Sequence, residues 1–211
     1  MKVYLDSLRQ NLQGSIEAKQ TLLSDTARLE SFGLVADLMV RTYQGGGRLY
    51  IAGNGGSAAD AQHLATEFVA KLARPRAPLP AEALTVDTSM LTAIGNDFGF
   101  DEVFARQILG KVTPKDLFLG ISTSGASPNI IRALEACREV GVTSVLLTGR
   151  DGGKAAKFAD YLLLAPGKTT SEIQEVHQVM YHTLCGCVEE AMFPLEDSST
   201  FNRPHPTLLD H

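Results

Sequence analysis

The segment that decides the fold is Ile51-Ala52-Gly53-Asn54-Gly55-Gly56-Ser57, which follows a short apolar run and precedes a helical pattern. A second segment of the same kind is Gly120-Ile121-Ser122-Thr123-Ser124-Gly125-Ala126-Ser127. Glycines let the backbone reach positive φ and approach a ligand closely, while hydroxyl groups and the free N–H groups of a helix N-terminus donate hydrogen bonds to an anion. The two segments therefore predict strand-to-helix turns that together hold a phosphosugar.

Neither segment is a nucleotide-binding motif. The first lacks the lysine and the Ser or Thr of the G-x-x-x-x-G-K-[ST] loop, and its G-N-G-G-S order does not match the G-x-G-x-x-G dinucleotide pattern. Hydroxyl groups and backbone N–H groups can hold a phosphate without basic residues. We expect no nucleotide cofactor.

Strands and helices alternate around these two segments. The apolar patterns predict strands at residues 48–52, 83–86, 117–121, 144–148 and 161–164. Helices are expected at residues 57–72, up to 91, 127–140, 154–158 and 171–191. This order predicts an α/β fold, with a doubly wound parallel five-stranded sheet flanked by helices. In such sheets ligands lie outside the carboxyl ends of the strands, so both segments can share one crevice.

Residues 4–42 have a helical pattern with a break around residues 31–33, which predicts two leading helices. Helices ahead of the first strand have no sheet face of their own to cover, so we expect them to pack against another subunit. We interpret residues 1–211 as a single domain. It comprises leading helices (1–44), the sheet core with a closing helix (45–194) and a polar tail (195–211).

Composition limits the possible functions of the chain. Of its 211 residues 44% are hydrophobic and 20% charged, and a net charge of -5 argues against general affinity for nucleic acids or acidic membranes. No apolar run is long enough to span a bilayer, and the acidic residue within positions 1–6 is atypical of a signal peptide, which predicts a cytoplasmic protein. An odd number of cysteines, Cys137, Cys185 and Cys187, indicates reduced thiols in the core.

Two polar stripes could carry chemistry. His63 and Glu67 lie one turn apart on the helix after the first glycine segment, although an exposed i,i+4 pair would look the same. The closing helix carries a second stripe in an otherwise apolar pattern, formed by Gln174, His177, Gln178, Tyr181 and His182. Facing stripes of this composition could form either a divalent-metal site or an acid-base pair, and the pattern leaves both open.

Two further segments have simpler interpretations. Ser127 and Pro128 have the order of an N-cap and a first helical residue, although capping alone does not explain four hydroxyl side chains among residues 122–127. Residues 96–101 are expected to form a loop after a short helix.

In these motifs the chain resembles the sugar isomerase (SIS) domain family and, within it, the phosphoheptose isomerases. The resemblance rests on AGNGGSAADAQHLATE (52–67), GNDFG (95–99), GISTSGAS (120–127), LTGRDGG (147–153) and IQEVH (173–177) with His182. It implies a homotetramer that interconverts sedoheptulose 7-phosphate and D-glycero-D-manno-heptose 7-phosphate through an enediol, in heptose nucleotide biosynthesis.

The resemblance also implies roles for individual residues. The phosphate would be bound by Ser122, Thr123, Ser124 and Ser127. The sugar would be bound by Asn54, Gly55, Gly56, Ser57, Glu67, Asn96, Asp97 and Gln174. Some members bind zinc, here one ion per subunit, through residues that match His63, Glu67, Gln174 and His182. Glu67 would be the catalytic base and His182 the acid. Two positions depart from the family pattern, with Lys71 in place of a frequent arginine and Ser171 in place of an occasional aspartate.

Three alternatives remain at this point. Replication-initiator-associating proteins resemble this chain in the loops but lack residues equivalent to Glu67 and His182, so the presence of both favours an enzyme. SIS-domain regulators that sense phosphosugars usually carry a further domain, and none is visible in this sequence. A hexulose-phosphate isomerase is the third, because the motifs do not show how the pocket measures the length of the carbon chain.

Overall fold

Five parallel strands form one sheet in the order β2-β1-β3-β4-β5, in a computed structural model that describes residues 2–194. The strands are β1 (Leu49–Gly53), β2 (Ala81–Ala83), β3 (Leu117–Ser122), β4 (Thr143–Gly149) and β5 (Tyr161–Ala165). Every residue of β1 and β3 is buried, as expected for central strands covered on both faces. The predicted doubly wound parallel sheet is confirmed.

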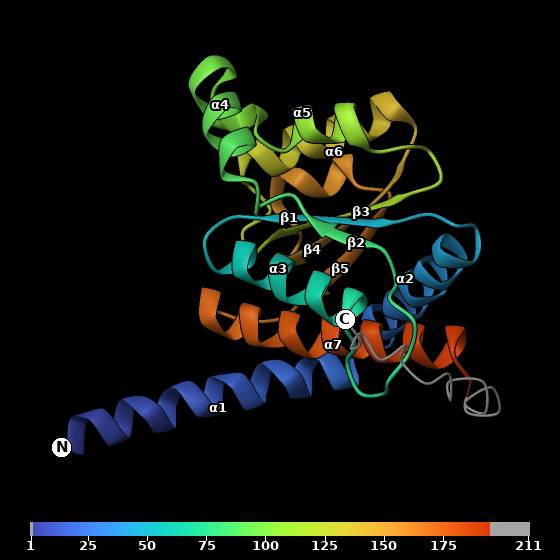
Figure 1. Ribbon diagram of the computed structural model, residues 1–211. Coiled ribbons are helices and arrows are strands. Elements are labelled where there is room, and N and C mark those ends of the chain that lie inside the picture. The colour runs from blue at the N-terminus through green and yellow to red at the C-terminus, as the bar shows by residue number, and fades with distance from the viewer. Residues whose placement is uncertain (1, 195–211) are drawn as a thin grey trace, which may run out of the picture.

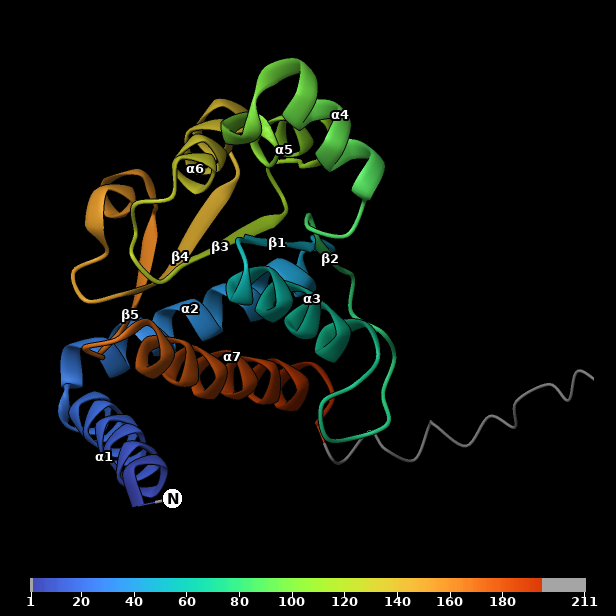
Figure 2. The ribbon, with the colours of Figure 1, turned by 90° about the vertical axis from the view of Figure 1, so that its left-hand side faces the viewer.

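Helices cover both faces of this sheet (Figures 1 and 2). One layer consists of α2 (Thr26–Gln44), α3 (Gly56–Val69) and α7 (Thr170–Met192), and α1 (Lys2–Ser24) packs on the outer side of α7. The other consists of α4 (Thr88–Phe98), α5 (Ala105–Lys111) and α6 (Pro128–Val140), with short 3-10 helices at Phe100–Glu102 and Gly153–Phe158. Alternate strand residues enter the two cores, Ile51 toward α3 and α7 and Tyr50 toward α5 and α6.

The strand order reverses at β1, which lies between β2 and β3. Gly53 at the end of β1 pairs with Ile121 near the end of β3, so the two glycine segments leave the sheet side by side at its carboxyl edge. A reversal of this kind opens a crevice between the loops that follow the two strands. The sheet therefore brings together the two segments that the sequence singled out.

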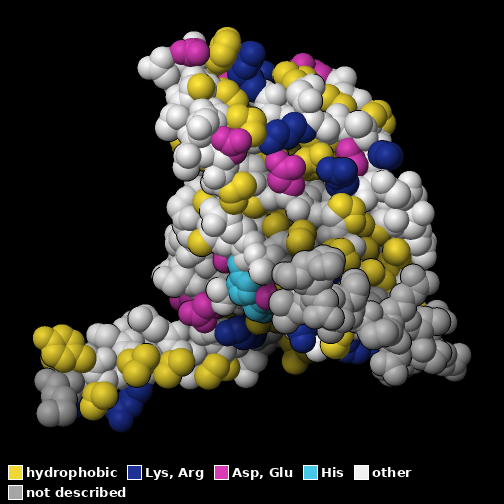
Figure 3. Space-filling model, viewed as in Figure 1, with side chains coloured by type: hydrophobic (Ala, Val, Ile, Leu, Met, Phe, Trp, Pro, Cys, Tyr) yellow, Lys and Arg dark blue, Asp and Glu magenta, His cyan; other side chains and the backbone are white. Residues whose placement is uncertain are grey.

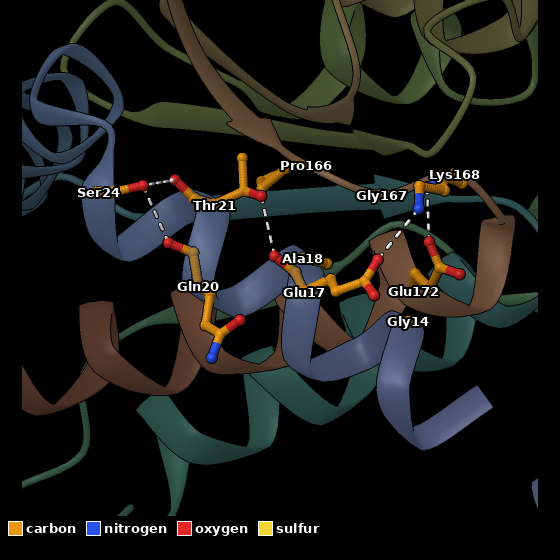
Figure 4. A pocket seen from close by; sticks show the side chains of 10 residues that line it. All are labelled: Gly14, Glu17, Ala18, Gln20, Thr21, Ser24, Pro166, Gly167, Lys168 and Glu172. Atoms are coloured by element: carbon orange, nitrogen blue, oxygen red, sulfur yellow. Dashed lines mark hydrogen bonds and ion pairs between the residues drawn. The ribbon is translucent and has the colours of Figure 1, made fainter. Parts of the chain in front are cut away.

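Helix α1 extends beyond the body of the protein and is held to it by polar contacts (Figure 1). Ser15 donates a hydrogen bond to Glu175 on α7, and Lys168 Nζ lies 3.1 Å from Glu17 Oε2. These contacts border a cavity of about 530 Å³ between α1 and the segment that leads to α7 (Figure 4). Helix α1 also carries exposed apolar side chains, and Figure 3 shows hydrophobic side chains along this helix. They include Leu5, Leu8, Leu12 and Ile16.

The break between the first two helices lies at Asp25, and the prediction of a break at residues 31–33 was wrong. Asp25 has an extended backbone, and its carboxylate accepts a hydrogen bond from the backbone N–H of Arg28 at 3.0 Å. This is an N-cap, which starts a new helix wherever a short acidic side chain can satisfy a free N–H group. Gly33 lies inside α2, where the packing of Val35 and Met39 outweighs its low helix propensity.

The region around α4 also differs from the expectation. Strand β2 occupies residues 81–83 rather than 83–86, and Asp87 caps α4 by accepting a hydrogen bond from the N–H of Met90 at 2.9 Å. Helix α4 then continues to Phe98, so residues 96–98 are helical and only the chain beyond them turns away. Helix α5 was not predicted at all. The predicted tail at 195–211 lies outside the described residues.

Within the described part of the chain, no helix has the length and apolar character needed to cross a membrane. Cys137 and Cys185 are buried and Cys187 is partly buried, and all three are free thiols, in agreement with the prediction.

Candidate active site

Helix α3 places His63 and Glu67 on its outer face. It starts after Gly55, whose φ of +56° favours glycine and turns the chain sharply out of β1. Leu64 and Phe68 bury the inner face of α3 against the sheet, which leaves His63 and Glu67 facing outward. Their side chains meet, with His63 Nε2 3.0 Å from Glu67 Oε1. The predicted i,i+4 pair therefore exists as a contact.

Helix α7 runs beside α3 and brings His182 to this pair. His182 Nε2 lies 3.5 Å from His63 Nε2, and the ligand atoms of His63, Glu67 and His182 all lie within 4.8 Å of one another. In Figure 3 histidine side chains reach the surface next to acidic ones on this face of the molecule. Residues that are far apart in the sequence, on α3 and on α7, therefore form one cluster of possible ligands or acid-base groups.

A buried hydrogen-bond chain orients His63 from behind. The Tyr181 hydroxyl lies 3.2 Å from His63 Nδ1 and 3.4 Å from Asp60 Oδ1. Burial raises the pKa of Asp60 above its ordinary value, and the hydrogen bond from Tyr181 opposes that rise. Because Tyr181 donates its hydroxyl proton to Asp60, its oxygen accepts a hydrogen bond from the Nδ1–H group of His63, and the lone pair on Nε2 then faces Glu67.

Asp60 was not predicted as a site residue. It lies three residues before His63 and seven before Glu67, so it shares their helical face, and that spacing could have identified it.

The short distance between His63 Nε2 and Glu67 Oε1 indicates that a cation could bind in this cluster. A carboxylate oxygen and an imidazole nitrogen 3.0 Å apart repel each other unless a proton or a cation lies between them. Two imidazoles and one carboxylate are ligands that Zn²⁺ accepts, and a hydrogen bond behind a ligating histidine is the usual arrangement. The three residues therefore fit a zinc ion.

The serine segment after β3 places hydroxyl groups at the start of α6. Ser127 is the N-cap residue of α6, as predicted, but its side chain makes no capping hydrogen bond and its Oγ lies 3.0 Å from Ser122 Oγ. Gly125 has a φ of +59°, and a Cβ there would overlap the carbonyl oxygen of Gly152. The tight turn thus holds two hydroxyl groups and an uncapped helix N-terminus toward the same space, which suits a phosphate group.

An amide pair joins the two glycine segments. Asn54 and Asn129 each donate to the other's side-chain oxygen at 2.8 Å, and Asn129 is 2% exposed. This contact fixes the start of α6 against the loop after β1. Asn129 was not predicted, although its place directly after the Ser-Pro helix start is a signal for a polar residue that faces the crevice.

Within one chain, the other predicted residues lie apart from the cluster of His63, Glu67 and His182. The Gln174 amide approaches Gly56, and Gln174 is two turns of α7 before His182, about 12 Å along the helix axis. Asn96 and Asp97 are exposed on the last turn of α4, in the opposite layer, and the Asn96 amide donates to Asp97 at 2.7 Å. Ser57 is 4% exposed, inside α3.

The stripe on α7 is divided by burial. His177 and Tyr181 are buried, Gln174 and His182 are partly buried, and Gln178 is exposed. Buried imidazoles usually have hydrogen-bond partners, but neither ring nitrogen of His177 has one among the described residues. Burial lowers the pKa of His177 to about 4. His177 is therefore a neutral core side chain in this structure.

The depressed pKa of His177 makes the protein less stable in acid. Because the unfolded chain binds this proton at pH 6.5 and the folded chain only near pH 4, the free energy of unfolding should fall as the pH drops between these values. The full loss is about 3 kcal/mol at 1.4 kcal/mol per pK unit. Urea unfolding of wild type and His177→Leu at pH 7.5 and pH 4.5 measures it. An equal acid-induced loss in both proteins would contradict this assignment.

Comparison with known proteins adds an independent line of argument. A family model described as "SIS domain" matches residues 13–149. A phosphoheptose isomerase from Aneurinibacillus thermoaerophilus is 49% identical over 188 residues, which cover 89% of this chain and 95% of that protein.

Solved structures agree with the sequence comparison. The phosphoheptose isomerase from Neisseria gonorrhoeae has a TM-score of 0.83 and 41% identity, covering 89% of this chain and 99% of that one. The one from Francisella tularensis has a TM-score of 0.84 and 33% identity, covering 89% and 98%. Identities at this level over nearly the whole of these proteins extend the likeness beyond the fold.

Proposed function

Because the chain belongs to the SIS-domain family and, within it, to the phosphoheptose isomerases, we propose that it interconverts sedoheptulose 7-phosphate and D-glycero-D-manno-heptose 7-phosphate. The observation that carries this proposal is the cluster in which His63 and Glu67, on the helix that starts at the glycine loop, meet His182 on α7. A base and an acid at one place are what an aldose-ketose isomerase needs, and a phosphosugar sensor needs neither.

In this proposal the phosphate is bound at the carboxyl edge of the sheet. The hydroxyl groups of Ser122 and Ser127 and the N-terminus of α6 donate hydrogen bonds to it, together with Thr123 and Ser124 of the same turn. Asn54, Gly55 and Gly56 lie across the crevice, where they would bind the sugar hydroxyls, with Ser57 at the start of α3. Neutral donors bind a phosphate without a cluster of basic residues.

The reaction moves a proton between C1 and C2 of the sugar. The Glu67 carboxylate takes the proton from one carbon, which produces the enediol, and returns it to the other carbon. His182 donates a proton to the carbonyl oxygen and accepts one from the neighbouring hydroxyl, so the enzyme ends each cycle in its starting protonation state. The hydrogen bond between His63 Nδ1 and the Tyr181 hydroxyl keeps the third member of the cluster oriented.

We also propose that His63, Glu67 and His182 hold one zinc ion per subunit. A bound zinc ion would polarise the substrate carbonyl group as a Lewis acid, which is the alternative to proton donation by His182. Since Gln174 lies about two helical turns from these residues in one chain, it would join them as a ligand only from a second copy.

Such an exchange of residues fits the proposed homotetramer. The exposed leucines on α1 supply apolar surface for assembly, which is unusual on a helix of a monomeric protein. Asn96 and Asp97, which lie far from the cluster in their own chain, would contact sugar bound by a neighbour. We place the enzyme in the cytoplasm, where its product would enter heptose nucleotide synthesis.

The proposal is tested by incubating the pure protein with sedoheptulose 7-phosphate and following the aldose product by NMR, with and without prior chelation and metal analysis. We expect turnover that falls after chelation and returns with zinc. Full turnover by metal-free protein would contradict the zinc site while supporting the isomerase. No turnover, together with tight binding to a replication initiator protein, would favour the non-enzymatic alternative.

A further inference from the structure

A buried ion pair lies at the far end of the two helices that carry the cluster. Arg76, in the segment after α3, and Glu189, near the end of α7, have side chains that are 2% and 3% exposed. Arg76 Nε donates to Glu189 Oε2 at 2.9 Å. The sequence positions are far apart, so the contact forms only when α7 has packed against α3.

The remaining donors of Arg76 hold the last turn of α3. Nη2 donates to the carbonyl oxygen of Glu67 at 2.6 Å, and Nη1 donates to that of Phe68 at 2.8 Å. Carbonyl groups at the end of a helix have no partner in the helix, and a positive charge there also interacts favourably with the helix dipole. The backbone of the proposed catalytic base is therefore bonded directly to Arg76.

Glu189 holds the segment that follows α3. Its carboxylate accepts hydrogen bonds from the backbone N–H groups of Arg74, at 3.1 Å, and Leu72, at 3.4 Å. Burial opposes ionisation, but the hydrogen bonds from Arg76 and these two N–H groups outweigh it and lower the pKa of Glu189. All the bonds together join the end of α3 to α7 at a fixed distance.

A buried ion pair is a weak source of stability, because apolar residues of similar volume often stabilise a protein as well or better. Apolar residues, however, cannot donate a hydrogen bond to the carbonyl group of Glu67 as Arg76 does. We propose that Arg76 and Glu189 are positioning residues that set the approach of Glu67 and His63 on α3 to His182 on α7. This inference rests on the proposed isomerase function.

The decisive variant replaces both charges, Arg76→Met with Glu189→Leu, because an apolar pair should keep the fold. We expect a folded protein with a lowered melting temperature, because at least four backbone groups lose their hydrogen-bond partners. We also expect an unchanged KM and a kcat about 100-fold lower, the usual effect of misplacing a reactive group by about 1 Å. Zinc affinity, measured by titration calorimetry, should fall about tenfold, as for other groups that orient metal ligands. A folded double variant with wild-type kcat and zinc affinity would overturn the inference.

Two further variants separate positioning from stability. Arg76→Lys keeps the charge but not the planar fork, so it should fold and lose part of the same kcat, and it decides the question if the double variant does not fold. Asp116→Ala removes a buried carboxylate with three hydrogen bonds at the opposite edge of the sheet. It should lower the melting temperature without lowering kcat. If Asp116→Ala lost as much kcat as the Arg76 and Glu189 variants, the proposal that Arg76 and Glu189 position the cluster would be overturned.

The readouts also distinguish this inference from the proposed function. If the wild-type protein does not turn over sedoheptulose 7-phosphate, the proposed function fails, and the zinc affinities of the same variants still test whether the pair positions the cluster. A wild-type protein that neither turns over the sugar nor binds zinc has no cluster to position, which overturns the inference as well.

Discussion

Glu67→Gln is expected to lower the kcat for isomerisation of sedoheptulose 7-phosphate by about 1,000-fold or more, the upper part of the range for loss of a general base. The amide has the shape of the carboxylate but cannot accept a proton from carbon. Glu67 lies on the outer face of α3 with its side chain 17% exposed, and glutamine has nearly the same size, so the substitution should not disturb the packing around it. The fold and the binding of the phosphate group should therefore remain.

The measurement is a steady-state assay of wild type and variant with matched melting curves. Glu102→Gln is a suitable control, since Glu102 is a partly exposed carboxylate paired with Arg132 in the opposite layer. That variant should keep the wild-type kcat. Equal turnover by Glu67→Gln would remove Glu67 from the role of base, and a lost thermal transition would attribute the effect to folding instead.

Replacing Ser122 and Ser127 together with alanine should raise the KM for the sugar phosphate, lowering kcat/KM by more than about 100-fold. Each hydroxyl donates one hydrogen bond to a charged group, and such bonds contribute about 1.5–3 kcal/mol each. Because the two Oγ atoms lie 3.0 Å apart across the turn, one phosphate can accept from both. The loss should appear mainly in KM, since neither serine touches the reacting carbons.

Inorganic phosphate gives a second measurement of this prediction. As a competitive inhibitor it should bind the double variant more weakly by a similar factor. Ser144→Ala is the matched control, because Ser144 is a buried hydroxyl bonded to Asp160 at the amino edge of the sheet. A double variant with unchanged KM and unchanged inhibition by phosphate would exclude the serine turn as the phosphate site.

Much of the fold could be predicted because it depends on local signals. Alternating apolar strands and helices identify a parallel sheet, and the order of the chain then places the glycine and serine segments at one edge. The break at Asp25 was missed because a single N-cap residue outweighs the glycine that looked like a helix breaker. Helix α4 was predicted too short because Asn96 and Asp97 favour turns but continue the helix here.

The site was predictable only in part for a similar reason. The spacing of His63 and Glu67 within one helix is visible in the sequence, and so is the stripe with His182. That the stripes meet depends on how α7 packs against α3, which no local pattern determines. The Arg76–Glu189 pair and the Asn54–Asn129 pair were invisible for the same reason, since each joins residues far apart in the chain.

Helix α7 lies outside the segment that the SIS family model matches, residues 13–149, while the glycine segment, the serine turn and α3 lie inside it. In the proposed function, the matched segment thus holds the phosphosugar site and the base Glu67, and the closing helix supplies the acid His182. The proposed chemistry therefore depends on a helix that lies beyond the segment matched by the family model.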